Sequence, residues 1–157
     1  MKKTWVLVVM VIIIGLVLAV SACKSKPEVK KTAEEAFQEV YDHYRKDLIL
    51  DGAENYTVVS GDTLVGISRR FYTDKVAEGQ NAGFYYPVIM LASSKTVLDP
   101  DKIAPGMELI IPDLEKNLAD NNAKSSIKKF LGDIAGIEDD RERASTASGL
   151  RELANSL

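Results

Sequence analysis

The chain has 157 residues and a formal net charge of −3, with 20 Lys and Arg against 23 Asp and Glu. This length suits one domain with a modest core, and the acidic balance argues against nucleic acid as a partner. Cys23 is the only cysteine. An intramolecular disulfide is therefore excluded, and packing alone must hold the fold.

The N-terminus has the three parts of an export signal. Two lysines precede an apolar run at 5–20, and small residues occupy positions 20–22 before Cys23. This arrangement resembles a bacterial lipoprotein signal, which implies cleavage before Cys23, a diacylglycerol on its sulfur and acylation of its new amino group. The alternative is an uncleaved membrane helix, because the run approaches the ~20 residues that span a bilayer. Either way, we expect the rest of the chain to be exported and tethered to a membrane.

A polar stalk and an amphipathic helix are predicted next. Residues 24–32 are charged and lack apolar periodicity, which is typical of a short flexible linker. Residues 33–50 place apolar side chains on one face of a helix, and this face needs a partner surface. The apolar positions are Ala33, Ala36, Phe37, Val40, Tyr41, Tyr44 and Leu48.

A strand, a sharp turn and a helix follow. Strand-forming residues occupy 56–59, Gly61 breaks the strand, and Asp62 is suited to cap a helix that begins near Thr63. The helix is expected to bury the positions that recur at helical spacing, which are Leu64, Ile67, Ser68 and Phe71.

The end of this region mirrors its beginning. Pro105-Gly106 suits the centre of a type II turn, residues 107–111 are predicted to form a strand, and Pro112 ends it. Between the two blocks, Pro87 favours the start of a second short helix. Its apolar side is predicted at Val88, Ile89, Leu91 and Ala92. The predicted order is strand, helix, helix, strand.

Three motifs in this region resemble the LysM family. They read Y-T-V-x-x-G-D-T-L at 56–64, I-x-x-x-F at 67–71 and D-P-D-x-I-x-P-G-x-x-L-x-I-P at 99–112. LysM modules have a βααβ fold and bind peptidoglycan and chitin through N-acetylglucosamine units. The resemblance implies an α+β fold, with two antiparallel strands packed by two helices. Amphipathic helices are expected on either side of this module.

By resemblance, the glycan would lie between the loop after the first strand and the loop before the second. The implied binding residues are Gly61, Asp62, Thr63, Leu64, Leu98, Asp99, Pro100 and Ile103. Additional contacts are predicted at Phe84, Tyr85, Tyr86 and Ser93. The alternative is structural: Asp62 as a helix cap, Leu64 and Ile103 as core, Pro100 as a turn former and the aromatic triplet as core.

The module departs from the family at two places. The usual asparagine after the second helix is replaced by Ser93 or Ser94, and the link at 73–86 is longer than the usual one. The longer link can reshape the sugar groove.

Amphipathic helices are predicted after Pro112. A short one lies near 114–119, a stronger one is capped by Ser125, and a third closes the chain, modestly weakened by Gly149. Isolated amphipathic helices are marginal in water, so we expect them to pack on the module.

The predicted segments are the signal at 1–22, the lipidated cysteine and stalk at 23–32, a helix at 33–52, the LysM module at 53–112 and a helical annex at 113–157.

The sequence predicts no catalyst, metal site or cofactor. Metal-assisted hydrolysis needs clustered ligands, yet His43 is the only histidine, and we expect it to be interfacial or solvated. No GxSxG elbow occurs. The acidic pairs at 34–35 and 139–140 are typical of solvated helix faces. Distant acids can still meet in a fold, so muramidase activity remains a third hypothesis.

The predicted function is non-catalytic binding of peptidoglycan by a lipoprotein of the bacterial cell envelope. The protein would face the periplasm, with the choice between inner and outer membrane open, and would link membrane to wall or localise a partner there. The alternative is an envelope scaffold whose C-terminal helices bind a protein partner and whose LysM fold has lost sugar affinity. The serine at the asparagine position and the long link motivate that alternative.

Overall fold

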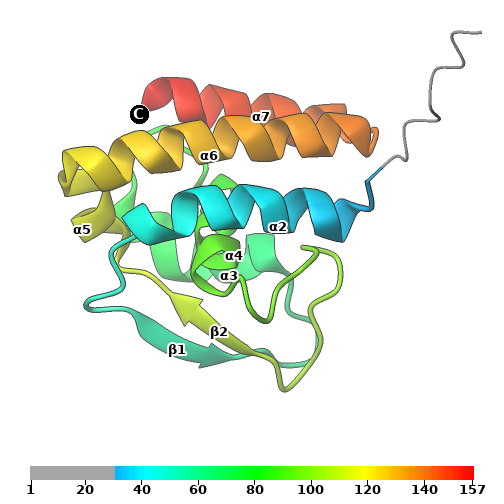
Figure 1. Cartoon of the computed structure of the whole chain (residues 1–157). Coiled ribbons are helices and arrows are strands. Elements are labelled where there is room, and N and C mark those ends of the chain that lie inside the picture. Colours follow the sequence, from blue (N-terminus) through cyan, green and yellow to red (C-terminus); the bar gives the residue numbers. More distant parts are fainter. Residues whose placement is uncertain (1–30) are drawn as a thin grey trace, which may run out of the picture. The chain divides into compact units, whose positions relative to one another are not determined.

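The computed structural model describes residues 31–157 (Figure 1). In it, β1 (Glu54–Thr57) and β2 (Glu108–Ile111) form a two-stranded antiparallel sheet, and two helices connect them, as the LysM resemblance implies. The predictions for the export signal and for lipidation at Cys23 lie outside the described residues.

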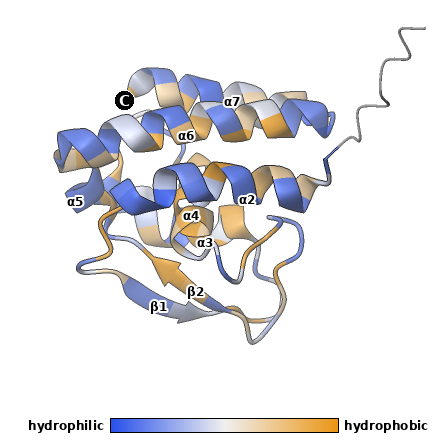
Figure 2. Cartoon of the chain, in the orientation of Figure 1, coloured by the Kyte–Doolittle hydropathy of each residue, from blue (hydrophilic) through white to orange (hydrophobic). Residues whose placement is uncertain are grey.

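The first strand lies earlier in the chain than predicted. Strand propensity favoured 56–59, but the ladder begins where Glu54 pairs with Ile111. β1 is polar and mostly exposed, as its blue ribbon shows beside the orange β2 (Figure 2). Glu54 and Asn55 have low strand propensity, so we infer that pairing with β2 holds this segment in the sheet. Past its end, the Val58 N–H still donates to the Met107 carbonyl at 2.9 Å.

The turn before β2 has the predicted form. The Met107 N–H donates to the Ala104 carbonyl at 3.1 Å, and Gly106 has a φ of +92°. Both features are those of a type II turn, in which the second central residue needs a positive φ.

The first connecting helix, α3 (Leu64–Tyr72), begins one residue after Thr63. The Thr63 hydroxyl accepts a hydrogen bond from the Gly66 N–H at 3.0 Å and so caps the helix. The fully buried side chains are Leu64, Ile67, Ser68 and Tyr72. The predicted face is thus confirmed at its first three positions, Phe71 is only partly buried, and Tyr72 had not been predicted.

The second connecting helix, α4 (Tyr86–Ala92), has Pro87 in its first turn, as predicted. All seven of its residues are buried. The four predicted apolar positions are thus confirmed, and the remaining three are buried as well because α3, β2 and the long helix α6 (Asn121–Asp140) all contact α4.

The helix before the module, α2 (Ala33–Tyr44), is shorter than predicted and continues as a 3₁₀ turn at Arg45–Asp47. Thr32 starts it with a capping box: its hydroxyl accepts from the Glu35 N–H, and the Glu35 carboxylate accepts from the Thr32 N–H at 2.8 Å. The final residue of the predicted stalk thus takes part in the helix.

Three helices follow the module: α5 (Leu114–Ala119), α6 and α7 (Ala144–Ser156). The predicted cap of the long helix at Ser125 was wrong. The Asp120 carboxylate accepts hydrogen bonds from the N–H groups of Asn122 and Ala123 at 2.9 and 2.8 Å, so α6 begins earlier. Only the first N–H groups of a helix lack backbone partners, so a capping side chain must come from a residue just before the helix. Asp120 has that position, whereas Ser125 lies inside α6.

α2, α6 and α7 lie over α3 and α4, and the sheet lies on the other side of these two helices (Figure 1). The rings of Tyr41 and Tyr44 on α2 lie 6.3 and 5.8 Å from the ring of Phe130 on α6. The flanking helices share one hydrophobic core with the module, as their apolar stripes predict. Across residues 31–157, none of the helices combines the length and apolarity that a bilayer crossing needs.

Candidate functional site

The loop after β1 is closed by the Asp62 carboxylate. It accepts hydrogen bonds from the Tyr56 hydroxyl at 2.5 Å, the Val59 N–H at 3.0 Å and the Arg70 guanidinium at 3.1 Å. These donors, the Tyr56 hydroxyl foremost, lower the pKa of Asp62 below its ordinary value. The prediction that Asp62 caps α3 was wrong, since its carboxylate turns back toward β1 and Thr63 caps the helix.

The loop before β2 is shaped by the carboxylate of Asp99, which is only 6% exposed. It accepts hydrogen bonds from the Asp101 N–H at 3.1 Å and from Arg141 at 3.0 Å. The first bond closes a tight turn around Pro100, and the second ties the loop to the C-terminal end of α6. Asp99 therefore holds the loop in shape, whereas Leu98 is 41% exposed.

A groove of about 320 Å³ lies between these two loops. The predicted glycan-binding residues that line it come from both loops and are Asp62, Thr63, Leu64, Pro100 and Ile103. The remaining predicted residues, Gly61, Leu98 and Asp99, lie outside its lining. The groove is completed by residues that had not been predicted, which are Val65, Tyr86, Asp101, Arg143 and Thr146.

Residues 56–112, which include both groove loops, α3, α4 and β2, match the family model of the LysM domain. The chain contains a LysM domain. LysM domains bind N-acetylglucosamine-containing glycans such as peptidoglycan, and they are binding modules. The groove is lined mostly by residues of this domain, with Arg143 and Thr146 as lining residues from beyond it.

Two curated relatives are similar to part of the chain. Esterase MT1326 and Esterase Rv1288, from two strains of Mycobacterium tuberculosis, are each 31% identical over 90 residues. The matched region covers 56% of this chain but only 18% of either esterase. No solved structure gives a significant match.

The aromatic triplet next to the LysM groove belongs mostly to the core. Tyr85 is fully buried and donates its hydroxyl hydrogen to the Gln80 side chain at 3.0 Å, and burial raises its pKa to about 12. Tyr86 lines the groove, but its hydroxyl donates inward to the Glu138 carboxylate at 3.3 Å. Phe84 is half-buried beside α7. Among these three, only Tyr86 reaches the groove.

Ser93, one of the two serines predicted at the place of the usual LysM asparagine, ties α4 to β2. It is 3% exposed, and its hydroxyl accepts a hydrogen bond from the Ile110 N–H at 2.9 Å. This hydroxyl oxygen satisfies a backbone donor that β1 does not pair, so it is occupied within the fold. Its predicted contact with the glycan stays a prediction, on a side chain that faces the strand.

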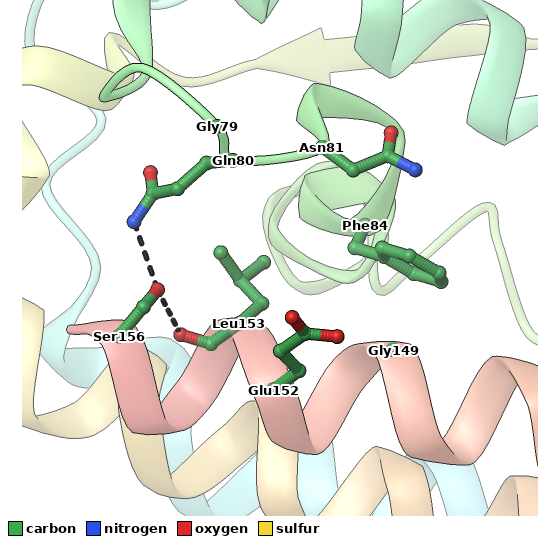
Figure 3. A pocket seen from close by; sticks show the side chains of 8 residues that line it. All are labelled: Gly79, Gln80, Asn81, Phe84, Gly149, Glu152, Leu153 and Ser156. Carbon is green, nitrogen blue, oxygen red and sulfur yellow. Dashed lines mark hydrogen bonds between the residues drawn. The ribbon is translucent and has the colours of Figure 1, made fainter.

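A second hollow, of about 270 Å³, lies between the long link and α7 (Figure 3). Its lining residues are Gly79, Gln80, Asn81, Phe84, Gly149, Glu152, Leu153 and Ser156. The Gln80 amide donates to the Ser156 hydroxyl at 2.8 Å, and its carbonyl accepts from Ala77 and Tyr85. The Gln80 side chain thus holds the link and the helix together.

The described residues contain no group of three or more His, Cys, Asp or Glu side chains placed to hold a metal ion. His43 is exposed on α2, and its ring lies 4.6 Å from that of Tyr44. This position fits the solvated role predicted for it.

Proposed function

We propose that the chain binds peptidoglycan, without cleaving it, in the groove between the loop after β1 and the loop before β2. The observation that carries this proposal is the lining of the groove, where residues of the loop after β1 and of the loop before β2, both within the LysM domain, meet around a volume of about 320 Å³. A volume of this size accommodates a small stretch of a sugar chain.

The chemistry of the groove suits a neutral sugar. Val65, Pro100 and Ile103 supply apolar surface for the faces of sugar rings, and the two loops supply backbone donors and acceptors for hydroxyl and acetamido groups. Val65, in the first turn of α3, lines the groove with a side chain that is 37% exposed. An exposed apolar side chain in a hollow offers a surface on which a sugar ring can pack.

The envelope setting is part of the proposal. A lipid on Cys23 would anchor the chain in a membrane facing the periplasm, with the binding unit at 31–157 reaching the wall. In that position the protein would link membrane and wall, or hold a partner protein at the wall.

A retention assay tests the proposal. Residues 24–157 are incubated with insoluble peptidoglycan and compared with Val65→Arg, which places a long charged side chain in the groove. Leu50→Arg is the matched control, because Leu50 has nearly the same exposure, 38%, and lines a different hollow. We expect wild type and control to be retained and Val65→Arg to bind at least about tenfold more weakly, a loss of about 1.4 kcal/mol.

Other outcomes point to the alternatives. No retention of the wild type at micromolar concentration would reject wall binding and favour the scaffold function. Reproducible release of soluble wall fragments would reject the non-catalytic function and favour a muramidase.

A further inference from the structure

We propose that the α6–α7 corner and the start of α7 form a third wall of the glycan groove, so that Arg143 and Thr146 contact the bound sugar. Both residues line the groove, although both lie outside the LysM domain. This inference rests on the proposed function and adds two specificity-determining residues to it.

The corner is fastened to the loop before β2 by a network of charged groups. Arg141 donates to Asp99 at 3.0 Å and to Asp101 at 2.6 Å, and Arg143 donates to Asp101 at 3.0 Å. The Arg141 side chain is only 15% exposed, so these charge-assisted bonds are partly shielded from water. Between the two arginines, Glu142 adopts a φ of +62°. This left-handed residue turns the chain sharply and lets both of its neighbours reach Asp101.

The buried carboxylate of Glu138 belongs to the same network. Glu138 is fully buried on α6, and it accepts a hydrogen bond from the Tyr86 hydroxyl. The guanidinium groups of Arg141 and Arg143 each lie 3.5 Å from its oxygens. Because Tyr86 and Arg143 both line the groove, Glu138 positions two of its walls at once.

The long link between α3 and α4 contacts the middle and the C-terminal end of α7. The Phe84 ring packs directly on Gly149, where an added Cβ would lie 2.0 Å from the ring (Figure 3). The Gln80 side chain bonds to Ser156 near the end of the same helix. The link that departs from the usual LysM length therefore acts on the groove indirectly, by holding the helix that carries Thr146.

The third wall offers both kinds of hydrogen-bonding group. Arg143, with its side chain 38% exposed, presents donors, and the Thr146 hydroxyl can both donate and accept. The Asp101 carboxylate, on the adjoining loop before β2, presents acceptors. The opposite charges of Arg143 and Asp101 offset each other, so this wall suits a neutral sugar with hydroxyl and acetamido groups. A neutral N-acetylglucosamine chain is the ligand class that matches it.

The test blocks the groove from α7 alone. Thr146→Trp places a large ring in the groove, while Ser148→Trp, at an exposed position of the same helix that lines neither hollow, is the control. N-acetylglucosamine oligomers are titrated into isotope-labelled residues 24–157 of wild type and both variants. We expect Thr146→Trp to weaken binding at least about tenfold and Ser148→Trp to leave it unchanged, with equal thermal stability. In the wild type, amide shifts should appear at 62–64 and also at 143–146.

The possible failures are distinguishable. Binding with shifts at 62–64 but none at 143–146, together with full affinity of Thr146→Trp, would overturn the third wall and leave the proposed function intact. If none of these amides changes its chemical shift at saturating oligomer, the proposed function is rejected, and the third wall is rejected with it. Arg143→Ala gives a second measure, because it shortens the wall without filling the groove and should weaken binding several-fold.

Discussion

Gly149 is expected to be required by packing, although a glycine within α7 would ordinarily weaken the helix. Replacing a helical glycine by alanine at an open position stabilises a protein by about 0.5–1 kcal/mol. Gly132 on α6 is such a position, because no atom lies within 4 Å of an added Cβ. At Gly149 the added Cβ would meet three atoms of the Phe84 ring at 2.0, 2.5 and 2.6 Å.

The expected magnitude follows from comparing these two sites. Both substitutions gain the same helical propensity, but Gly149→Ala must also displace the ring, and such overpacking costs about 1–3 kcal/mol. We therefore expect Gly149→Ala to be less stable than Gly132→Ala by about 1–3 kcal/mol in urea denaturation. If α7 shifts as the ring moves, Gly149→Ala should also weaken oligomer binding, whereas Gly132→Ala should not.

A double-mutant cycle isolates the contact. Once Phe84→Ala has removed the ring, Gly149→Ala should stabilise the chain as much as Gly132→Ala does, since nothing opposes its Cβ. The two changes at the contact should therefore be non-additive by about the strain energy, 1–3 kcal/mol. The reasoning would be refuted if Gly149→Ala and Gly132→Ala proved equally stabilising in the wild-type background.

Two further predictions concern buried polar groups. Ser93→Ala leaves the Ile110 N–H without its partner and should lower the unfolding free energy by about 1–3 kcal/mol. The matched control is Ser94→Ala at the neighbouring buried serine, which should lower it much less; equal losses would contradict this. Burial raises the pKa of Glu138 above 4.5, so the folded chain keeps this proton to higher pH than the unfolded chain does. The contribution of Glu138 to the unfolding free energy should therefore fall as pH rises from 4.5 toward neutrality. The difference in unfolding free energy between wild type and Glu138→Gln, measured by denaturation across this range, should change accordingly; a difference independent of pH would contradict this.

Local signals in the sequence predicted local structure well. The type II turn at 105–106 depends only on the two residues in its centre, and the structure contains it. The buried face of α3 follows from helical spacing over a few residues. It was harder to predict which of two neighbouring polar side chains caps α3, because Asp62 and Thr63 can both do so. Asp62 does not cap the helix, since its carboxylate accepts hydrogen bonds from the Tyr56 hydroxyl and the Arg70 guanidinium instead.

Long-range contacts set the limits of the sequence interpretation. β1 was misplaced because its ladder depends on a partner strand far along the chain. The acidic pair at 139–140 was interpreted as part of a solvated helix face, and its composition gave no indication that the adjacent Glu138 is fully buried. Gly149 was interpreted as a weak point in a helix, because the ring that requires it comes from another segment.

The sequence by itself determined the order strand, helix, helix, strand and the turn at 105–106, because turn and helix preferences act between residues a few positions apart. The LysM motifs added, by resemblance, the expectation that the loop after the first strand faces the loop before the second. Only the tertiary structure decided that Arg143 and Thr146 complete the groove and that the long link holds α7 in place. Those contacts depend on how α6 and α7 pack against the module, and no spacing along the chain encodes that packing.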